Sequence, residues 1–274
     1  MSRSLLRKAG SALFILVVWQ ILVQTGNINE LFLPAPLSVL KAMWAMTVSG
    51  QLPWAVLVSL NRVVQGFVYG SLVGIVLGLL AGAIGWIEDV LDPWIAAVYP
   101  IPKSALFPLF LLWFGLGDSS KIVTIAVGVL FLVLVNTITG VKSINPLLIK
   151  AALDLGASRF QIFVKVILPG SLPNIFTGLR LGAGMALILV FITEIEATKA
   201  GLGFLLWESF QLLETKNVFA GVVTFGILGV ATTWLLQWIE RLAARLRRVP
   251  RRVHEELDAV AFRILEVDRP RIAV

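Results

Sequence analysis

Between two long apolar runs, the chain carries a more polar stretch from Asn145 to Arg180, which reads NPLLIKAALDLGASRFQIFVKVILPGSLPNIFTGLR. Its first residues indicate the start of a helix, because Asn145 supplies a capping side chain and Pro146 suits the first helical position. The pattern predicts a short helix from Pro146 to Leu155 that stops at Gly156, where glycine commonly ends a helix. The stretch therefore begins with a capped element and not with a loose loop.

A second short helix is predicted directly after the first. Ser158 followed by Gln161 three residues later matches a capping box. We expect this helix to run to about Leu168, where Pro169 and Pro173 should end it because proline interrupts the helical hydrogen bonds. Two short helices joined at the glycine would form a compact protrusion between two spans.

The composition around this stretch is typical of a membrane protein. Of the 274 residues, 58% are hydrophobic and 14% are charged, and the mean hydropathy is +0.91. Soluble domains carry about 25% charged residues, so an ordinary soluble enzyme, a disordered chain and a disulfide scaffold are excluded. The chain has no cysteine and a single histidine, His254, so it lacks the residues for thiolate metal sites, cysteine nucleophiles or histidine dyads.

The fold class predicted from the apolar runs is all-α, a polytopic membrane protein with six transmembrane helices. A span needs about 20 mostly apolar residues. The first run is preceded by basic residues, as in a signal peptide, but no small-residue cleavage motif follows it, so we expect a retained span. The predicted spans are Ala9 to Val23, Val63 to Ile84, Ser104 to Leu116, Ile122 to Thr139, Leu179 to Thr193 and Val218 to Ile239. The third is short and is interrupted by prolines, which membrane proteins tolerate where protein or a wet cavity surrounds the break.

The positive charges predict the orientation. With six spans, 18 of the 23 Lys and Arg residues fall on the side of both termini and 5 on the opposite side. Basic residues in short loops favour the cytoplasm. Both termini and the stretch 140–180 are therefore expected in the cytoplasm, with the chain in the bacterial cytoplasmic (inner) membrane.

Glycine recurs at every fourth position through the second span, at Gly66, Gly70, Gly74, Gly78 and Gly82. Small residues at this spacing let helices approach closely. Because four residues advance about 400° around a helix, we expect the row to sweep across more than one neighbour. It is consistent with static packing or with a surface that slides. A similar row in the fifth span, Gly178, Gly182, Ala186, Val190 and Glu194, is expected to face a neighbouring helix.

The stretch between the fourth and fifth spans resembles the EAA loop of bacterial ABC-importer permeases. The resemblance is carried by Lys150-Ala151-Ala152, by Gly156 four residues after the second alanine, and by Val166-Ile167-Leu168-Pro169. It departs from the family pattern at Lys150, which replaces a glutamate, and at Val166, which replaces an isoleucine. Further motifs are similar to the branch that serves nitrate, taurine and other sulfonates, namely Leu33-Pro34-Ala35-Pro36, Trp113-Phe114-Gly115-Leu116-Gly117, Leu155-Gly156-Ala157-Ser158-Arg159, Leu168-Pro169-Gly170-Ser171-Leu172-Pro173, Thr177-Gly178-Leu179-Arg180 and Gly201-Leu202-Gly203.

The resemblance implies that this protrusion is a coupling helix that seats in a groove on a separate ABC ATPase subunit. Small residues would allow close docking, and Asp154 and Arg159 would set the register. The alternative is an amphipathic helix on the lipid surface, with Lys150, Arg159 and Lys165 near the headgroups. The residues assigned to coupling are Lys150, Ala151, Ala152, Asp154, Gly156, Ala157, Ser158 and Arg159.

The chain itself is not expected to be an enzyme, because no G-x-x-x-x-G-K-[ST] loop occurs in it. ATP and Mg would bind to the partner ATPase, and no cofactor is expected in this chain. The resemblance further implies a periplasmic or lipid-anchored substrate-binding protein, a second permease copy, lipid contact and no nucleic acid. The cargo it implies is nitrate, taurine, another sulfonate or a similar small anion. The alternative function is an ATP-independent secondary transporter or channel.

We divide the chain into residues 1–24, a permease core at 25–240 with the coupling loop 141–178, and a basic tail at 241–274. Charged residues in spans are expensive and mark candidate pathway residues. Glu194 and Glu196 close the fifth span but lie about 200° apart on a helix, so at most one should line the route, and we favour Glu194. Lys103 and Arg62 would either attract an anion or extend to the membrane interface.

Overall fold

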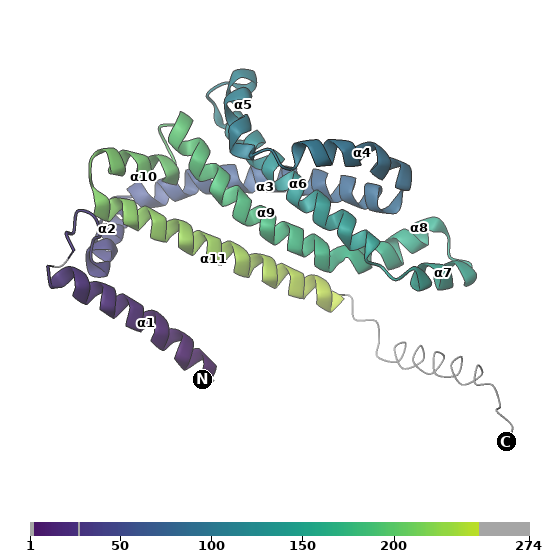
Figure 1. Cartoon of the computed structure of the whole chain (residues 1–274), viewed down its shortest axis with the longest axis horizontal. Coiled ribbons are helices and arrows are strands. Elements are labelled where there is room, and N and C mark those ends of the chain that lie inside the picture. The colour runs from purple at the N-terminus through teal and green to yellow at the C-terminus, as the bar shows by residue number, and fades with distance from the viewer. Residues whose placement is uncertain (1–2, 27, 247–274) are drawn as a thin grey trace. The chain divides into compact units, whose positions relative to one another are not determined.

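The computed structural model describes residues 3–26 and 28–246, and all regular elements in these residues are helical (Figure 1). The described chain divides into two units, with the boundary between Trp234 and Leu235 inside the last helix. The elements are α1 (Arg3–Gln24), α2 (Pro36–Val48), α3 (Gln51–Ala83), α4 (Gly85–Val98), the 3-10 turn η1 (Lys103–Leu106), α5 (Phe107–Phe114), α6 (Asp118–Lys142), α7 (Pro146–Asp154), α8 (Arg159–Ile162), the π-helical turn η2 (Phe163–Ile167), α9 (Leu168–Ala197), α10 (Leu202–Gln211) and α11 (Thr215–Leu246).

Four helices are long and apolar enough to cross a membrane: α3, α6, the continuous stretch Arg159–Ala197, and Thr215–Ala243 within α11. Two further segments account for the rest of the prediction. The pair Gly85–Val98 and Lys103–Phe114 passes the same test together, and α1 contributes a shorter apolar part, Leu13–Gln24. The all-helical membrane architecture is confirmed, and the count of six stays a prediction that takes the bent pair and α1 as one span each.

The third predicted span, Ser104 to Leu116, corresponds to the second half of a bent pair in the structure. The helix α4 comes before it and belongs to the same apolar pair, which bends by 90° between Val98 and Lys103. Pro100 and Pro102 lie in this break. Proline lacks a backbone N–H and clashes with the preceding turn, which favours an interruption of the helix at this point. Sequence analysis assigned α4 to a loop and therefore recognised half of the pair.

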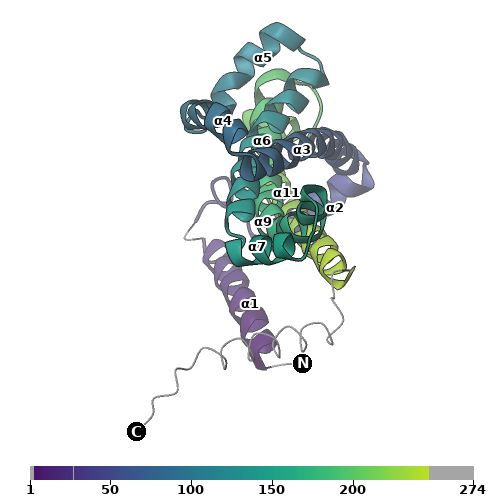
Figure 2. The same ribbon diagram turned by 90° about the vertical axis from the view of Figure 1, so that its right-hand side faces the viewer.

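The centre of the first unit consists of α3, α6 and α9, which pack side by side (Figure 2). Their shared core contains the buried residues Val63, Ile125, Val129, Val133, Ala186, Leu189 and Val190. A second core forms where α2 and α10 pack on the beginning of α3, and it contains Val39, Met46, Leu52, Ala55, Leu202, Leu205 and Ala220. Neither α2 nor α10 is among the six predicted spans. They extend the contacts of α3 beyond the central three helices.

The glycine row of α3 faces one neighbour, α6, along its whole length. A Cβ atom at Gly66 would lie 2.6 Å from Ile125, and one at Gly82 would lie 2.6 Å from Val141. Between them, added Cβ atoms at Gly70 and Gly74 would meet the carbonyl oxygens of α6, with Ala126 at the first position. The expectation of more than one neighbour is wrong. A four-residue row is inclined to its helix axis, and a partner that crosses along the row stays in contact with it.

The corresponding row of α9 also packs on α6, as predicted. A Cβ atom at Gly178 would lie 2.9 Å from the Cβ of Asn136, and one at Gly182 would lie 3.1 Å from Val129. Ala186 and Val190 continue the row and are fully buried. The middle helix α6 is therefore held on two sides by helices whose glycines allow backbone approach.

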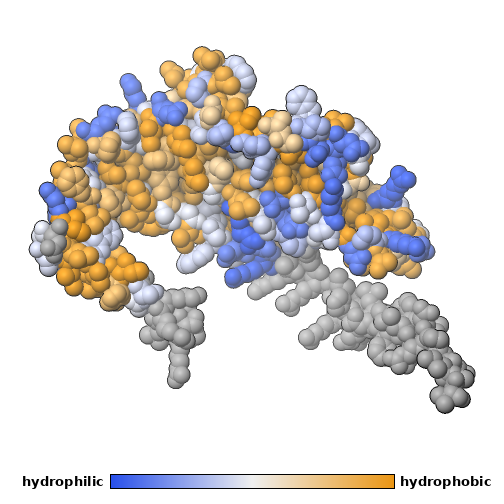
Figure 3. Space-filling model, viewed as in Figure 1, coloured by the Kyte–Doolittle hydropathy of each residue, from blue (hydrophilic) through white to orange (hydrophobic). Residues whose placement is uncertain are grey.

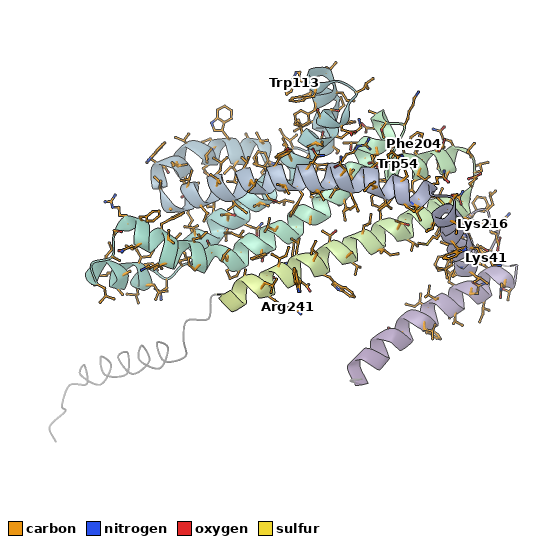
Figure 4. All side chains as sticks on the ribbon, turned by 180° about the vertical axis from the view of Figure 1, so that it is seen from behind. Lys41, Trp54, Trp113, Phe204, Lys216 and Arg241 are labelled. Atoms are coloured by element: carbon orange, nitrogen blue, oxygen red, sulfur yellow. The ribbon has the colours of Figure 1, made fainter. Side chains whose placement is uncertain are left out.

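The outer surface of these helices is apolar. Figure 3 shows hydrophobic residues over most of the described surface in this view. Large aliphatic side chains such as Leu72, Val76, Ile188 and Ile227 are exposed on α3, α9 and α11. Patches of this extent are rare on soluble monomers and fit a hydrocarbon environment. Figure 4 shows Trp113, which lies near the C-terminal end of α5 and is exposed.

The prediction that Pro169 and Pro173 end the helix after Ser158 is wrong. The chain stays helical from Arg159 to Ala197. Pro169 lies in the first turn of α9, after the π-helical turn Phe163–Ile167, and Pro173 lies inside α9. A π-helical turn carries wider i→i+5 hydrogen bonds, which shifts the bonding register just before the proline. The short helix α8 and the membrane helix α9 thus form one continuous rod.

We predict opposite effects for two glycine-to-alanine changes. Gly70→Ala should lower the free energy of unfolding by about 1–3 kcal/mol, because the new Cβ overlaps the carbonyl group of Ala126. Gly184→Ala has no atom within 4 Å of its added Cβ and should raise stability by about 0.5–1 kcal/mol, as alanine does inside a helix. Thermal unfolding in detergent measures both. Equal melting temperatures for the two variants would contradict the close α3–α6 contact.

Candidate functional site

The predicted caps of the stretch 145–162 are confirmed. The side chain of Asn145 accepts a hydrogen bond from the backbone N–H of Leu147 at 2.9 Å, and α7 follows to Asp154. Gly156 has φ +79°, a conformation that glycine adopts without strain. The backbone N–H of Ser158 donates to Gln161 at 2.8 Å, and the N–H of Gln161 donates to the Ser158 hydroxyl at 3.3 Å. The capping box therefore forms as predicted.

Most residues assigned to coupling are exposed in the single chain. Ala152 and Ala157 are half-buried, while Lys150, Ala151, Asp154, Gly156, Ser158 and Arg159 are exposed. Large apolar side chains accompany them on the surface, at Leu147, Leu148, Leu153, Leu155 and Phe160. Leu155 is 88% exposed, a high value for a residue in an ordered, capped segment. We call residues 145–162 the coupling segment below, and its docking role stays a prediction.

The coupling segment is anchored at its base. Phe163, Ile167 and Leu168 pack against a buried cluster of Leu79, Val141 and Ile175, which come from α3, α6 and α9. At the same end, Lys142 in the last turn of α6 forms an ion pair with Glu88 in the first turn of α4. The base thus contacts the three central helices, and an ion pair connects their end to the bent helix pair.

A buried ion cluster lies at the opposite end of the central helices, where α6 begins and α9 ends. The Glu194 carboxylate is fully buried. Arg62 Nη1 lies 2.7 Å from Glu194 Oε1, and Arg62 Nη2 lies 2.7 Å from Asp118 Oδ1. Arg62 also donates to the carbonyl of Ala200 at 2.8 Å. One guanidinium thus joins α3, the beginning of α6, and the end of α9 with the turn that follows it.

The second oxygen of Glu194 is also held by hydrogen bonds. The Ser59 hydroxyl lies 2.8 Å from each carboxylate oxygen, and the backbone N–H of Gly203 donates to Oε2 at 2.8 Å. Ser59 Oγ in turn accepts from the N–H of Leu202 at 2.8 Å. A Cβ atom at Gly201 would overlap the carboxylate, and one at Gly203 would lie 2.9 Å from Glu194 Cβ. The Gly201-Leu202-Gly203 motif therefore gives the carboxylate its space and a backbone donor.

The two predicted pathway carboxylates have different environments. Glu194 lies in the ion cluster, and Glu196 is exposed. Their pathway role stays a prediction. Sequence analysis missed the partners of Glu194, because Ser59, Arg62 and Asp118 lie more than 70 residues away along the chain. Arg62 was expected to attract an anion or to extend to the interface, and it instead forms ion pairs with two carboxylates. Charged residues near the ends of adjacent spans are the signal that would suggest such pairing.

Two buried lysines hold breaks in the helices. Lys121 Nζ donates to the carbonyls of Leu116 and Gly117 at 2.9 and 3.0 Å, in the turn before α6. Lys103 Nζ donates to the carbonyls of Val98, Tyr99 and Ile101, in the break of the bent pair. Carbonyls at a helix end lack intrahelical partners, and an ammonium group satisfies several of them at once. Among the described residues no group of three or more His, Cys, Asp or Glu is placed to hold a metal ion.

Comparisons with known proteins agree with this architecture. The family described as "Binding-protein-dependent transport system inner membrane component" matches residues 74–245. The taurine transport system permease protein TauC of Escherichia coli (strain K12) is 34% identical over 248 residues, which cover 88% of this chain and 90% of TauC. The riboflavin transport system permease protein RibX of Chloroflexus aurantiacus is 32% identical over 233 residues, covering 85% and 87%.

Two solved structures share the fold. An amino acid ABC transporter crystallised with histidines has a TM-score of 0.57 and 19% identity, over 68% of this chain and 91% of the matched chain. The MetNI methionine ABC transporter in an inward-facing conformation has a TM-score of 0.50 and 20% identity, over 78% and 99%. At these identities the similarity concerns the helical architecture alone.

We predict that Glu194→Gln destabilises the protein by roughly 3 kcal/mol, because it leaves the buried Arg62 without one of its two charge partners. Glu196→Gln removes the same charge from an exposed position on the same helix and should change stability by less than about 0.5 kcal/mol. Thermal unfolding of the two detergent-purified variants provides the comparison. If both variants have the melting temperature of the wild-type protein, the ion cluster does not stabilise the fold.

Proposed function

The chain belongs to the family of binding-protein-dependent transport system inner membrane components, the permease subunits of ABC importers, and we propose that it forms the membrane route for a small anion. Its relatives are membrane subunits and not enzymes, and the ATPase is a separate subunit. The observation that carries the proposal is the family match over most of the chain together with the exposed coupling segment. Family membership also argues against the alternative of an ATP-independent transporter or channel.

We infer that the coupling segment docks on the ATPase. Three features support this inference: the segment is capped at both short helices, it exposes apolar side chains, and it continues into α9 without interruption. A flexible protrusion would bend under load, whereas a rod transmits displacement to the spans. The lipid-surface alternative accounts for the exposed leucines but gives no reason for a rigid connection to α9.

The remaining assembly follows from this arrangement. One coupling segment per chain engages one ATPase, so two copies of the chain would engage an ATPase dimer, and we propose a homodimer. The excess of Lys and Arg supports a cytoplasmic coupling segment and cytoplasmic termini. A substrate-binding protein would then deliver cargo at the opposite end, near the ion cluster. Glu196 and Asp118 are exposed carboxylates there, and Glu194 holds the end of α9 in place.

The cargo class rests on sequence similarity. The motifs around the coupling segment suggest the sulfonate and nitrate branch. TauC, which aligns with 88% of this chain, is a taurine permease. The riboflavin permease RibX matches nearly as well, so the family match alone leaves the cargo open. We propose a small sulfonate or similar oxyanion. ATP and Mg would bind to the ATPase partner.

We predict that Ala151→Trp abolishes ATP-driven uptake without harming membrane insertion. Ala151 is exposed on α7, so a large side chain has room in the free chain but would block close docking. Association with the co-expressed ATPase should weaken by roughly 2 kcal/mol or more, as for a central interface residue. Copurification of the two subunits and ATP-dependent uptake of taurine into proteoliposomes measure the effect.

Ala151→Ser is the matched control, because it changes polarity with little change in size, and it should retain association and uptake. The docking proposal is wrong if Ala151→Trp copurifies with the ATPase and takes up taurine like the wild-type protein. The transport proposal as a whole is wrong if the wild-type complex, supplied with a binding protein, shows no ATP-dependent uptake of any small anion.

A further inference from the structure

The break between α4 and η1 encloses a lysine. Lys103 is 9% exposed, and its Nζ lies 2.7 Å from the carbonyl oxygens of Val98 and Ile101 and 3.1 Å from that of Tyr99. These three hydrogen bonds use all three N–H donors of the ammonium group. The oxygens satisfy the donors, but carbonyl groups are dipoles and carry no net charge. The break therefore contains a whole positive charge.

This charge lies at the middle of the membrane-spanning helices. Lys103 Nζ is 5.0 Å from the centre of the Phe131 ring. Phe131 is thirteen residues from Asp118 and eleven from Lys142, the two ends of α6. From the sequence, Lys103 is predicted to lie in a cytoplasmic loop. In the structure it lies beside Phe131, in the middle of α6.

Among the described residues, no carboxylate lies within ion-pair distance of Lys103. The other lysine that is buried among the described residues, Lys121, also forms no ion pair, but it lies in the first turn of α6 with Asp118, next to the ion pairs that Arg62 forms with Asp118 and Glu194. That cluster of two cations and two carboxylates is neutral. An unmatched charge at membrane depth is expensive, and such residues are associated with the transport route.

The break also has the position expected of a route. Tyr99 and Ile101 are exposed in the single chain, and both flank Pro100. Irregular backbone at membrane depth is tolerated only where protein covers it or where it lines a water-filled cavity. Discontinuous helices near the midplane are where transporters hold charged cargo. By this rule, the exposed side of the break is expected to face a water-filled cavity or a second copy of the chain, and not lipid.

We propose that Lys103 is the positive charge that attracts the anionic cargo at the middle of the route, and that its ligand class is a small oxyanion such as a sulfonate. The inference rests on the proposed anion transport and adds the residue that selects for charge. The ammonium group attracts the anion by its charge. One of its three N–H donors can also exchange a carbonyl of the break for an oxygen of the anion as its hydrogen-bond acceptor. It is a binding residue and takes part in no chemical step.

The test measures ligand binding to the complete permease–ATPase complex without a binding protein, so that delivery does not affect the result. Equilibrium dialysis compares ethanesulfonate with ethyl methyl sulfone, an uncharged analogue. Lys103→Gln keeps N–H donors for the turn carbonyls and removes the charge. It should weaken ethanesulfonate binding by about 30-fold or more, the scale of losing one partner of a buried charge pair. Lys103→Arg should retain binding.

Lys121→Gln is the matched control, because Lys121 holds a turn by the same kind of hydrogen bonds but lies in the neutral cluster. It should bind ethanesulfonate with nearly wild-type affinity. Thermal unfolding verifies that each variant is folded. If Lys103→Gln does not fold, the wild-type preference for ethanesulfonate over the sulfone takes its place, and equal affinities for the two ligands overturn the proposal.

The possible outcomes distinguish the role of Lys103 from anion transport itself. Wild-type affinity in Lys103→Gln overturns the role of Lys103 and leaves anion transport intact. An equal loss in Lys121→Gln also overturns it, because the effect would then come from a loosened turn. Absence of ethanesulfonate binding together with absence of ATP-dependent anion uptake by the wild-type complex overturns the proposed anion transport itself.

Discussion

The structure of the central helices depends on one buried carboxylate. Glu194 is enclosed at the end of α9, and an ionised group without partners there would be strongly destabilising. The Glu194 carboxylate forms an ion pair with Arg62 and accepts hydrogen bonds from Ser59 and from the backbone N–H of Gly203. Because these partners belong to different elements, satisfying a single charge fixes α3, α9 and α10 relative to one another, and Arg62 extends the connection to α6 through Asp118.

This cluster and the coupling segment lie at opposite ends of the same two helices. α6 begins at Asp118 and ends just before the segment, and α9 begins just after the segment and ends at Glu194. Between the two ends, glycine rows on α3 and α9 hold α6 at close range on two sides. Close-packed cores shift as units and do not deform continuously. A displacement of the coupling segment, if it docks as we propose, would therefore reach the ion cluster through these close-packed helices.

Features that depend on neighbouring residues could be predicted from the sequence, whereas contacts between residues far apart in the chain could not. The caps at Asn145 and Ser158 were correct, because a capping interaction involves residues two or three positions apart. The proline rule failed at Pro169, where a π-helical turn accommodates the residue. The cluster around Glu194 was missed, because its members are brought together only when three spans pack. The row of α3 was recognised, but its single partner depends on how α6 crosses it.

Two buried lysines with the same local role show how a membrane protein separates structure from function by the placement of charge. Lys121 and Lys103 both satisfy the carbonyls of an interrupted helix. By their hydrogen bonds alone the two lysines have the same role, and an uncharged N–H donor could satisfy the carbonyls of either turn. Lys121 lies in the first turn of α6 with Asp118, next to the ion pairs of Arg62, so its charge is close to carboxylates. Among the described residues, Lys103 contacts three carbonyl dipoles and the Phe131 ring and forms no ion pair, so no carboxylate there balances its charge. A cation at mid-membrane lowers the barrier for anions and raises it for cations, which is the physical basis of the role that we propose for Lys103.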